Sequence, residues 1–341
     1  MNIPRPTTCL ALALLAAPLA AGTQYRVTVR GEVEFNGIGS GPLSQVQVGE
    51  SATLVATVDE DVFVDSGSFP TRGYALNSFA LEFDSGPVGL QNPFPGTPFF
   101  VLRDNDPAVD GFFIASNVNF PTGVPLNVAG GFGQFANNFS VTYQNDPLPS
   151  LDIADAVGTY DFTGLSVFNW TIDDGPFNPF GILFEDLTIE EIVPGSLLLY
   201  GCGVNPAGSI ADAGSQPSIG KGIRLALDNP LGTQASGSLT ALMFGFAPQP
   251  GFPCGVSLPG FGMSGAGANG ELLVQLVPAS PIVPGPAWVG PGTPSVVEVP
   301  LPDDPALVAF TVYAQGLLYD PAGSQGVFFG LTDAYAVTIG N

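Results

Sequence analysis

Residues 307–339 read LVAFTVYAQGLLYDPAGSQGVFFGLTDAYAVTI, and they predict two long β-strands joined by a turn. Apolar and aromatic residues recur at every second position along both arms, a pattern typical of half-buried antiparallel strands. One face of the first arm carries Val308, Phe310, Val312, Ala314 and Leu318. One face of the second arm carries Val327, Phe329, Leu331, Tyr335, Val337 and Ile339. The connection, Asp320 to Ser324, contains a Pro, which fixes φ, and a Gly, which accepts positive φ, so it predicts a turn.

Short apolar runs of the same kind fill the rest of the chain, and they are separated by segments rich in Gly and Pro. The 341 residues include 45 Gly and 34 Pro, and no window combines helical periodicity with capping signals. Tyr25 to Phe35 is a typical run, with apolar residues on one face and charged residues on the other. We therefore predict an all-β chain made of two consecutive antiparallel β-sandwich, jelly-roll-like domains after a signal peptide.

The chain divides into three segments. Residues 1–22 have the features of a secretory signal peptide: Arg5, an apolar run from Leu10 to Leu19, and small residues at the end. A change in composition near Pro194 separates an acidic domain, 23–194, from a Gly- and Pro-rich domain, 195–341. Because the C-terminus has no hydrophobic tail, we expect no transmembrane anchor and a secreted, extracellular or cell-surface protein, with the periplasm as the alternative.

Charge and composition limit the chemistry. The chain has 30 Asp and Glu against 7 Lys and Arg, a net charge of −23, so we expect no nucleic-acid partner. It has no His, which excludes Ser-His-Asp and Cys-His catalysis as well as His-ligated zinc or haem. Its acidic surface permits basic partners or divalent cations, although acidic residues also simply keep proteins soluble.

Three cysteines are present, and Cys9 would leave with the signal peptide. The remaining two, Cys202 and Cys254, predict one disulfide in an exported protein. Closing a loop of this size would stabilise the fold by roughly 4 kcal/mol on the chain-entropy model. Two unpaired buried thiols are the alternative.

One segment is a candidate calcium site. Residues 103–111 read RDNDPAVDG, in which Asp104 and Asp106 lie two positions apart and Asp110 could add a third carboxylate. Oxygen-only ligands beside a turn glycine suit Ca²⁺. The segment lacks the glycine position and closing Glu of an EF-hand, and the same residue types form ordinary turns.

Two further patterns bear on catalysis and nucleotide binding. Residues 265–270 read GAGANG, which fits the spelling of a dinucleotide loop, but a predicted strand follows where that loop needs a helix. Glycosidase chemistry needs only two carboxylates, and Glu185, Asp186, Glu190 and Glu191 are available. Their spacing marks no acid and nucleophile pair, so we interpret them as solvent-facing strand residues.

Two tryptophans could stack on sugars. Trp170 lies in a predicted strand and is expected in the core, whereas Trp288 lies in a Pro-rich loop and is expected to be exposed.

Residues 196–341 resemble a C-terminal module of secreted planctomycete-type bacterial proteins. The resemblance rests on Tyr200-Gly201-Cys202-Gly203, Gly251-Phe252-Pro253-Cys254-Gly255 and above all Val312 to Pro321. The first half is more weakly similar to the β-sandwich ectodomains of PEP-CTERM proteins, on Tyr25 to Gly31, Val48-Gly49-Glu50 and Gly158 to Phe162, but it lacks their sorting tail. The resemblance implies an exported β-rich protein with no assigned catalytic residues.

These observations predict a non-catalytic, secreted or cell-surface structural or interaction protein, with an extracellular protein, an envelope protein or a glycan as the partner. An extracellular carbohydrate- or calcium-binding module is the alternative. A secreted hydrolase that uses two carboxylates is the third possibility. The sequence does not determine the oligomeric state.

Overall fold

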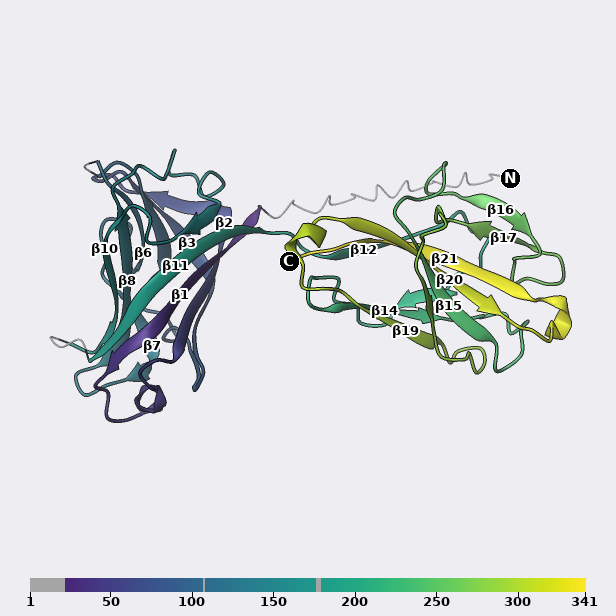
Figure 1. Ribbon diagram of the computed structural model, residues 1–341, viewed down its shortest axis with the longest axis horizontal. Coiled ribbons are helices and arrows are strands. Elements are labelled where there is room, and N and C mark those ends of the chain that lie inside the picture. The colour runs from purple at the N-terminus through teal and green to yellow at the C-terminus, as the bar shows by residue number, and fades with distance from the viewer. Residues whose placement is uncertain (1–21, 107, 176–178) are drawn as a thin grey trace, which may run out of the picture. The chain divides into compact units, whose positions relative to one another are not determined.

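The computed structural model describes residues 22–106, 108–175 and 179–341, so all but the last residue of the predicted signal peptide lies outside the described residues. The chain divides into two compact units, with the boundary between Glu191 and Ile192. Both units are built from β-strands, which confirms the all-β prediction (Figure 1). Among the described residues, helical structure is limited to three short 3-10 turns, Pro42–Gln45, Pro305–Leu307 and Ser324–Gly326.

Among its described residues, the first unit contains eleven strands in one sheet. They are β1 (Gln24–Asn36), β2 (Ser51–Asp65), β3 (Thr71–Phe83), β4 (Gly86–Val88), β5 (Phe99–Arg103), β6 (Asp110–Ala115), β7 (Val124–Ala129), β8 (Gln134–Tyr143), β9 (Gly158–Tyr160), β10 (Leu165–Asp173) and β11 (Phe180–Ile192).

Eight of these strands form a closed barrel. They follow the order β1-β2-β3-β5-β6-β8-β10-β11, and β11 pairs back onto β1, beside which it lies in Figure 1. The short strands β4, β7 and β9 extend the sheet from β3, β8 and β11. The sandwich expected for the first domain is therefore wrong, because a sheet whose first and last strands pair with each other encloses a single interior.

Alternation along the strands fills the barrel interior with apolar side chains. On β1, Tyr25, Val27 and Val29 are buried, and the intervening positions are partly exposed. Aromatic rings fill the interior next to them: the Phe100 and Phe112 rings stack with centroids 5.9 Å apart. Trp170 is 1% exposed, as expected for a core residue.

The second unit contains ten strands in three sheets. They are β12 (Ser196–Tyr200), β13 (Ile210–Asp212), β14 (Gly222–Leu227), β15 (Leu239–Gly245), β16 (Val256–Pro259), β17 (Asn269–Leu272), β18 (Ile282–Pro284), β19 (Ser295–Pro300), β20 (Thr311–Tyr319) and β21 (Phe329–Thr338).

A five-stranded sheet, β12-β21-β20-β15-β18, forms the middle of this unit. One face packs against the three-stranded sheet β13-β14-β19 through a shared core that includes Leu225, Leu242 and Val337. The other face packs against the β16–β17 hairpin and the residues after it, through a second core that includes Tyr200, Leu273 and Leu331. The second unit therefore has two sheets packed face to face, and the hairpin adds a third layer.

Strands β20 and β21 pair antiparallel, as residues 307–339 predict. On β20, Ala314 and Leu318 are buried in the core shared with the three-stranded sheet, on the face expected for them. On β21, Tyr335 and Val337 join the same core, but Leu331 lies in the second core, on the opposite face. The single apolar face predicted for the second arm is therefore wrong, since an irregularity in β21 reverses the alternation.

Candidate functional site

The irregularity in β21 is a β-bulge. Gln315 pairs with Ala334 and Leu317 pairs with Leu331, so one residue of β20 faces two residues of β21, Thr332 and Asp333. The facing residue is Gly316, where a Cβ would lie 2.5 Å from Leu227 and 2.9 Å from Thr332, so any larger residue would displace these two side chains. The Gly316 N–H donates to Thr332 Oγ1 at 2.8 Å. The bulge changes the direction in which the Asp333 side chain points.

Two buried amides hold the bulge in place. Asn205 Nδ2 and Gln315 Nε2 each donate to the Thr332 carbonyl at 2.7 Å. The same two groups donate to the Glu271 carbonyl on β17, at 2.9 and 2.7 Å. Their oxygens accept from the backbone N–H groups of Glu271 and Leu273, each at 2.9 Å. Because Asn205 is 2% exposed and Gln315 is fully buried, these bonds lie in the interior, where an unmade bond would be costly.

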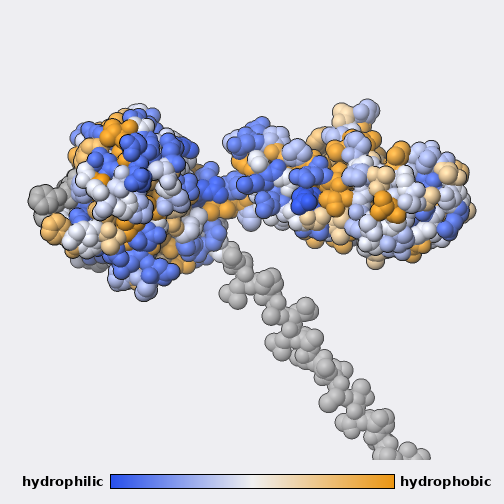
Figure 2. Space-filling view, turned by 90° about the horizontal axis from the view of Figure 1, so that it is seen from below, coloured by the Kyte–Doolittle hydropathy of each residue, from blue (hydrophilic) through white to orange (hydrophobic). Residues whose placement is uncertain are grey.

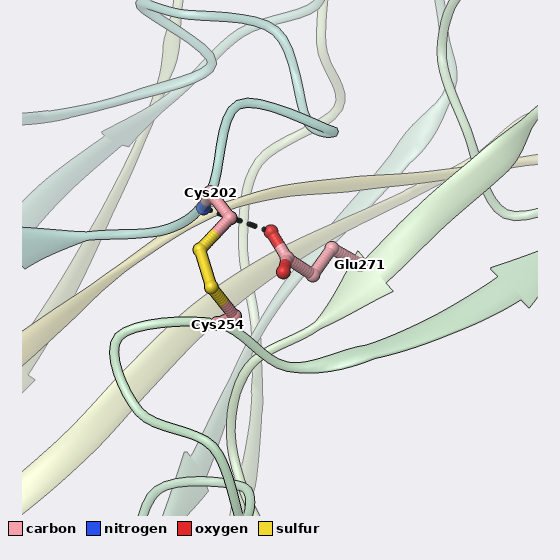
Figure 3. Close-up of side chains that lie close together, drawn as sticks. All are labelled: Cys202, Cys254 and Glu271. Atoms are coloured by element: carbon pink, nitrogen blue, oxygen red, sulfur yellow. Dashed lines mark hydrogen bonds between the residues drawn. A yellow bond between two sulfur atoms is a disulfide. The ribbon is translucent and has the colours of Figure 1, made fainter.

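The Glu271 carboxylate lies against the disulfide (Figure 3). Glu271 is 3% exposed; its Oε2 accepts from the Cys202 N–H at 3.0 Å and its Oε1 accepts from the Gly255 N–H at 2.8 Å. The predicted disulfide between Cys202 and Cys254 is present, with the two Cα atoms 5.1 Å apart. The two sulfurs and a Glu271 oxygen lie within 4.8 Å of one another. With the sulfurs bonded to each other, this group is a structural crosslink around a buried carboxylate.

Asp333 differs from the other acidic residues of this region. Its Oδ1 is buried and has no hydrogen-bond partner among the described residues. Burial, and secondly the nearby Glu271 charge, raise the pKa of Asp333 to about 6. A Cβ on Gly201, which has φ of +153°, would lie 2.7 Å from this oxygen, so Gly201 leaves the space that the carboxylate occupies. Asp333 is therefore a partly desolvated carboxylate whose buried Oδ1 is an unused acceptor.

Asp333 lines a cavity of about 400 Å³. The other lining residues come from the loop after β12, the segment after β14 and the connection between β16 and β17: Gly203, Val204, Asn205, Pro206, Ala207, Pro230, Leu231 and Ser264. The walls are mostly apolar, and Asp333 is the one charged residue among them. Perturbed carboxylates that line cavities are candidates for functional sites.

The predicted calcium segment lies in the first unit, between β5 and β6, and Pro107 within it lies outside the described residues. Oxygens of Asp104 and Asp110 lie within 4.8 Å of each other and of Asp146, which follows β8. Asp106 is not part of this group; its backbone N–H donates to the Val109 carbonyl at 2.9 Å.

Asp110 is fully buried, and both of its oxygens accept backbone N–H groups, from Asn105 at 2.9 Å and from Leu148 at 2.8 Å. Burial and the charges of Asp110 and Asp146 raise the pKa of Asp104. Asp110 thus holds the loops that contain Asn105 and Leu148, and the carboxylates of Asp104 and Asp146 lie close to it.

Two acidic residues of β11, Asp186 and Glu190, form ion pairs with β1. Arg26 Nη1 lies 2.9 Å from Glu190 Oε1, and Arg30 Nη1 lies 3.1 Å from Asp186 Oδ1, so both pairs join β1 to β11. Glu185 is exposed. These side chains lie on the outside of the barrel and contribute modestly to its closure, as partly exposed ion pairs do.

Trp288 contradicts the prediction of an exposed aromatic. It is 1% exposed, and its Nε1 donates to Asp228 Oδ1 at 2.6 Å. Trp170 is equally buried, with its Nε1 donating to Asn137 Oδ1 at 3.0 Å. Because both tryptophans of the chain are buried, neither is placed to serve as a stacking platform for sugars.

An apolar groove of about 400 Å³ lies elsewhere on the second unit. It includes Phe246 and Phe310, which are 56% and 42% exposed and have ring centroids 6.1 Å apart. Figure 2 shows hydrophobic side chains gathered over part of the second unit, among hydrophilic ones. Exposed apolar patches of this kind mark contact surfaces in soluble proteins.

Sequence reasoning missed Glu271, Asp333 and Asn205. The available signal was polar residues inside otherwise apolar runs: Thr332-Asp333 interrupts the apolar alternation of β21, and Glu271 precedes Leu272-Leu273-Val274. Such interruptions indicate a bulge or a buried polar network, although they do not show which residues meet.

No protein-family model, no curated protein and no solved structure matches this chain. Among the described residues, none of the helical segments has the length and apolar character needed to cross a membrane.

Proposed function

We propose that this chain is a non-catalytic structural or interaction protein that works outside the cytoplasm, at the cell surface or in the medium around it. The disulfide fits an oxidising compartment. The resemblance of residues 196–341 to a module of exported bacterial proteins fits the same location.

The observation that carries this proposal is the use of the buried carboxylates. Among the described residues, each buried acidic side chain accepts at least two N–H hydrogen bonds, at 2.6–3.0 Å, from loop backbone or an indole. These side chains are Asp110, Asp228, Glu271 and Asp320. A carboxylate bonded in this way positions loops and has little capacity left for proton transfer to a substrate. The buried charges therefore support a rigid scaffold that presents its surfaces.

Variants of these carboxylates test the proposal. Asp228→Asn and Asp320→Asn are expected to lower the melting temperature of the second unit, and the full chain is expected to show no turnover of chromogenic glycoside, ester or peptide substrates. Glu298→Gln is a matched control, because that carboxylate is 69% exposed. Turnover that these variants abolish without changing the melting temperature would refute the proposal and favour a carboxylate-dependent hydrolase.

Calcium binding in the first unit is a second candidate function. It is favoured by the close approach of Asp104, Asp110 and Asp146, whose oxygens lie within 4.8 Å of one another. A bound Ca²⁺ would offset the repulsion among the three charges and stabilise the first unit by mass action. Calorimetry with and without millimolar Ca²⁺ tests this: a higher melting temperature for the first unit, absent in Asp146→Asn, supports the site, and an unchanged transition refutes it.

A further inference from the structure

The cavity beside the β21 bulge has one charge and no counter-charge. The second unit contains two basic residues, Lys221 and Arg224. Both line a different hollow, and Arg224 lies 3.6 Å from Glu298. Neither lines the Asp333 cavity. The second unit therefore supplies no basic side chain to this cavity, so a cation that pairs with Asp333 would not come from this unit.

The side-chain oxygens around the cavity determine which kind of cation it can bind. A hard divalent metal takes six or more oxygen ligands and binds best where several carboxylates meet, whereas the side chains of the cavity walls offer one carboxylate and the Ser264 hydroxyl. The Asn205 amide is already fully engaged with the backbone. An ammonium group needs few acceptors, and it donates up to three hydrogen bonds from a single point.

The cavity walls determine which chemical group can carry the ammonium. Pro206, Pro230 and Leu231 line the same cavity as Asp333 and provide apolar surface. Burying the methylene groups of a ligand against such a surface is favourable in free energy, while its charged end stays paired with a carboxylate. A slim aliphatic chain that ends in an ammonium group matches both the walls and the carboxylate.

We propose that this cavity binds a primary alkylammonium group, supplied either by a lysine side chain of a partner protein or by a free aliphatic amine. The Asp333 carboxylate pairs with the ammonium, the Ser264 hydroxyl accepts a second hydrogen bond, and the apolar walls pack against the methylene groups. This inference rests on the proposed function, since it assumes that the cavity binds its ligand without turning it over.

Protonation limits the pH range of binding. Asp333 is ionised above about pH 6, because burial and the Glu271 charge raise its pKa to that value. Among the described residues, Glu271 on β17 is the one other charged group that shifts the pKa of Asp333; the nearby Cys202 and Cys254 carry no charge because they are bonded to each other. Alkylammonium groups stay protonated up to about pH 10. Binding is therefore strongest between these limits and decreases as the pH falls below 6.

Calorimetric titration of the full chain with n-butylammonium chloride at pH 7.5 tests the site, with n-butanol as the uncharged isostere and acetyl-Gly-Lys-Gly-amide as the lysine probe. The parent is expected to bind both cations and not the alcohol. Asp333→Asn is expected to weaken binding by about tenfold or more, since it removes a charge-assisted hydrogen bond. Glu298→Gln is the matched surface control and is expected to bind like the parent.

A second variant keeps the test independent of how Asp333→Asn folds. Ser264→Lys places an ammonium at the cavity wall, and it is expected to abolish binding of the free cation and to raise the melting temperature of the second unit. Equal binding by parent and Asp333→Asn, or no binding of either cation, would refute the site and leave the proposed function standing. Chemical conversion of the amine would refute the proposed function and leave the site standing. Tighter binding of the lysine peptide than of butylammonium identifies a protein partner, and the reverse order identifies a free amine.

Discussion

Glu271→Gln is expected to destabilise the second unit strongly while leaving the first unit unchanged. The side chain keeps its size, but one carboxylate oxygen becomes an NH₂ group. That NH₂ would face the N–H group of either Cys202 or Gly255, both of which now donate to Glu271 at 3.0 and 2.8 Å. One donor loses its acceptor in the interior, and the remaining bond loses its charge assistance.

The expected loss is about 2–4 kcal/mol in the free energy of unfolding. A hydrogen bond to a charged group contributes about 1.5–3 kcal/mol, and an unsatisfied buried donor costs about 1–3 kcal/mol. Glu271 is 3% exposed, so solvent cannot replace the missing partner. For a unit of this size, the melting temperature falls by roughly 5–15 °C.

Tryptophan fluorescence can report on the second unit alone. The chain has two tryptophans, Trp170 in the first unit and Trp288 in the second, and both are 1% exposed. In a Trp170→Phe background, guanidinium unfolding followed by Trp288 fluorescence gives the midpoint and slope of the second unit. Glu298→Gln in the same background is the control and is expected to change stability by less than about 0.5 kcal/mol.

Two results would refute this reasoning. An unchanged midpoint in Glu271→Gln would show that the two N–H bonds do not stabilise the unit. The variant is also expected to lower the pKa of Asp333, since the Glu271 charge is one of the two causes that raise it to about 6. A carboxyl titration by NMR that still gives about 6 would show that burial alone causes the shift.

Three further measurements test other parts of the structure. Folding raises the pKa of Asp333 from 3.8 to about 6, so the folded state binds this proton more tightly than the unfolded state does. The stability of the parent relative to Asp333→Asn is therefore expected to fall as the pH rises from about 4 to 6 and to stay level above pH 6. A constant difference in urea midpoints across this range would contradict the shift. Replacing both Cys202 and Cys254 with Ser is expected to lower the unfolding free energy of the second unit by about 2–4 kcal/mol, measured by Trp288 fluorescence, and an equal loss in the first unit would show that the units are coupled. Asp110→Ala leaves two loop N–H groups without an acceptor, so differential scanning calorimetry is expected to show a first-unit transition lowered by about 2–4 kcal/mol, and an unchanged transition would contradict the role of this carboxylate.

The alternating apolar residues were sufficient to predict the β-strands and the pairing of β20 with β21. They did so because period-two burial is a local property that each strand carries in its own residues. The disulfide between Cys202 and Cys254 was predictable for a different reason, since removal of Cys9 with a signal peptide leaves a single possible pair.

Long-range features could not be predicted in this way. The pairing of β1 with β11 joins segments about 150 residues apart, and periodicity is the same for a strand in a barrel and in a sandwich. The exposure expected for Trp288 failed because its partner, Asp228, lies 60 residues away. Asp146 replaces Asp106 beside Asp104 and Asp110 because a loop after β8, distant in sequence, folds back to them.

The candidate site was hidden for a related reason. The alternation of β21 predicts one continuous apolar face, and a single extra residue at Thr332-Asp333 reverses it for Leu331. Gly316, which faces the bulge, is one of 45 glycines and has no distinguishing neighbour in the sequence. Only the three-dimensional meeting of β17, β20 and β21 shows that Asp333 Oδ1 has no hydrogen-bond partner among the described residues.

In each unit the first strand pairs with the last: β1 with β11, and β12 with β21. Neither unit can complete its sheet before its final strand has been synthesised, so each half stays unfinished until its closing residues arrive. Because the chain is synthesised from the N-terminus, the first unit would complete its fold before the second. The same adjacency brings the ends of each unit together, which makes each one a self-contained cassette for transplantation or circular permutation.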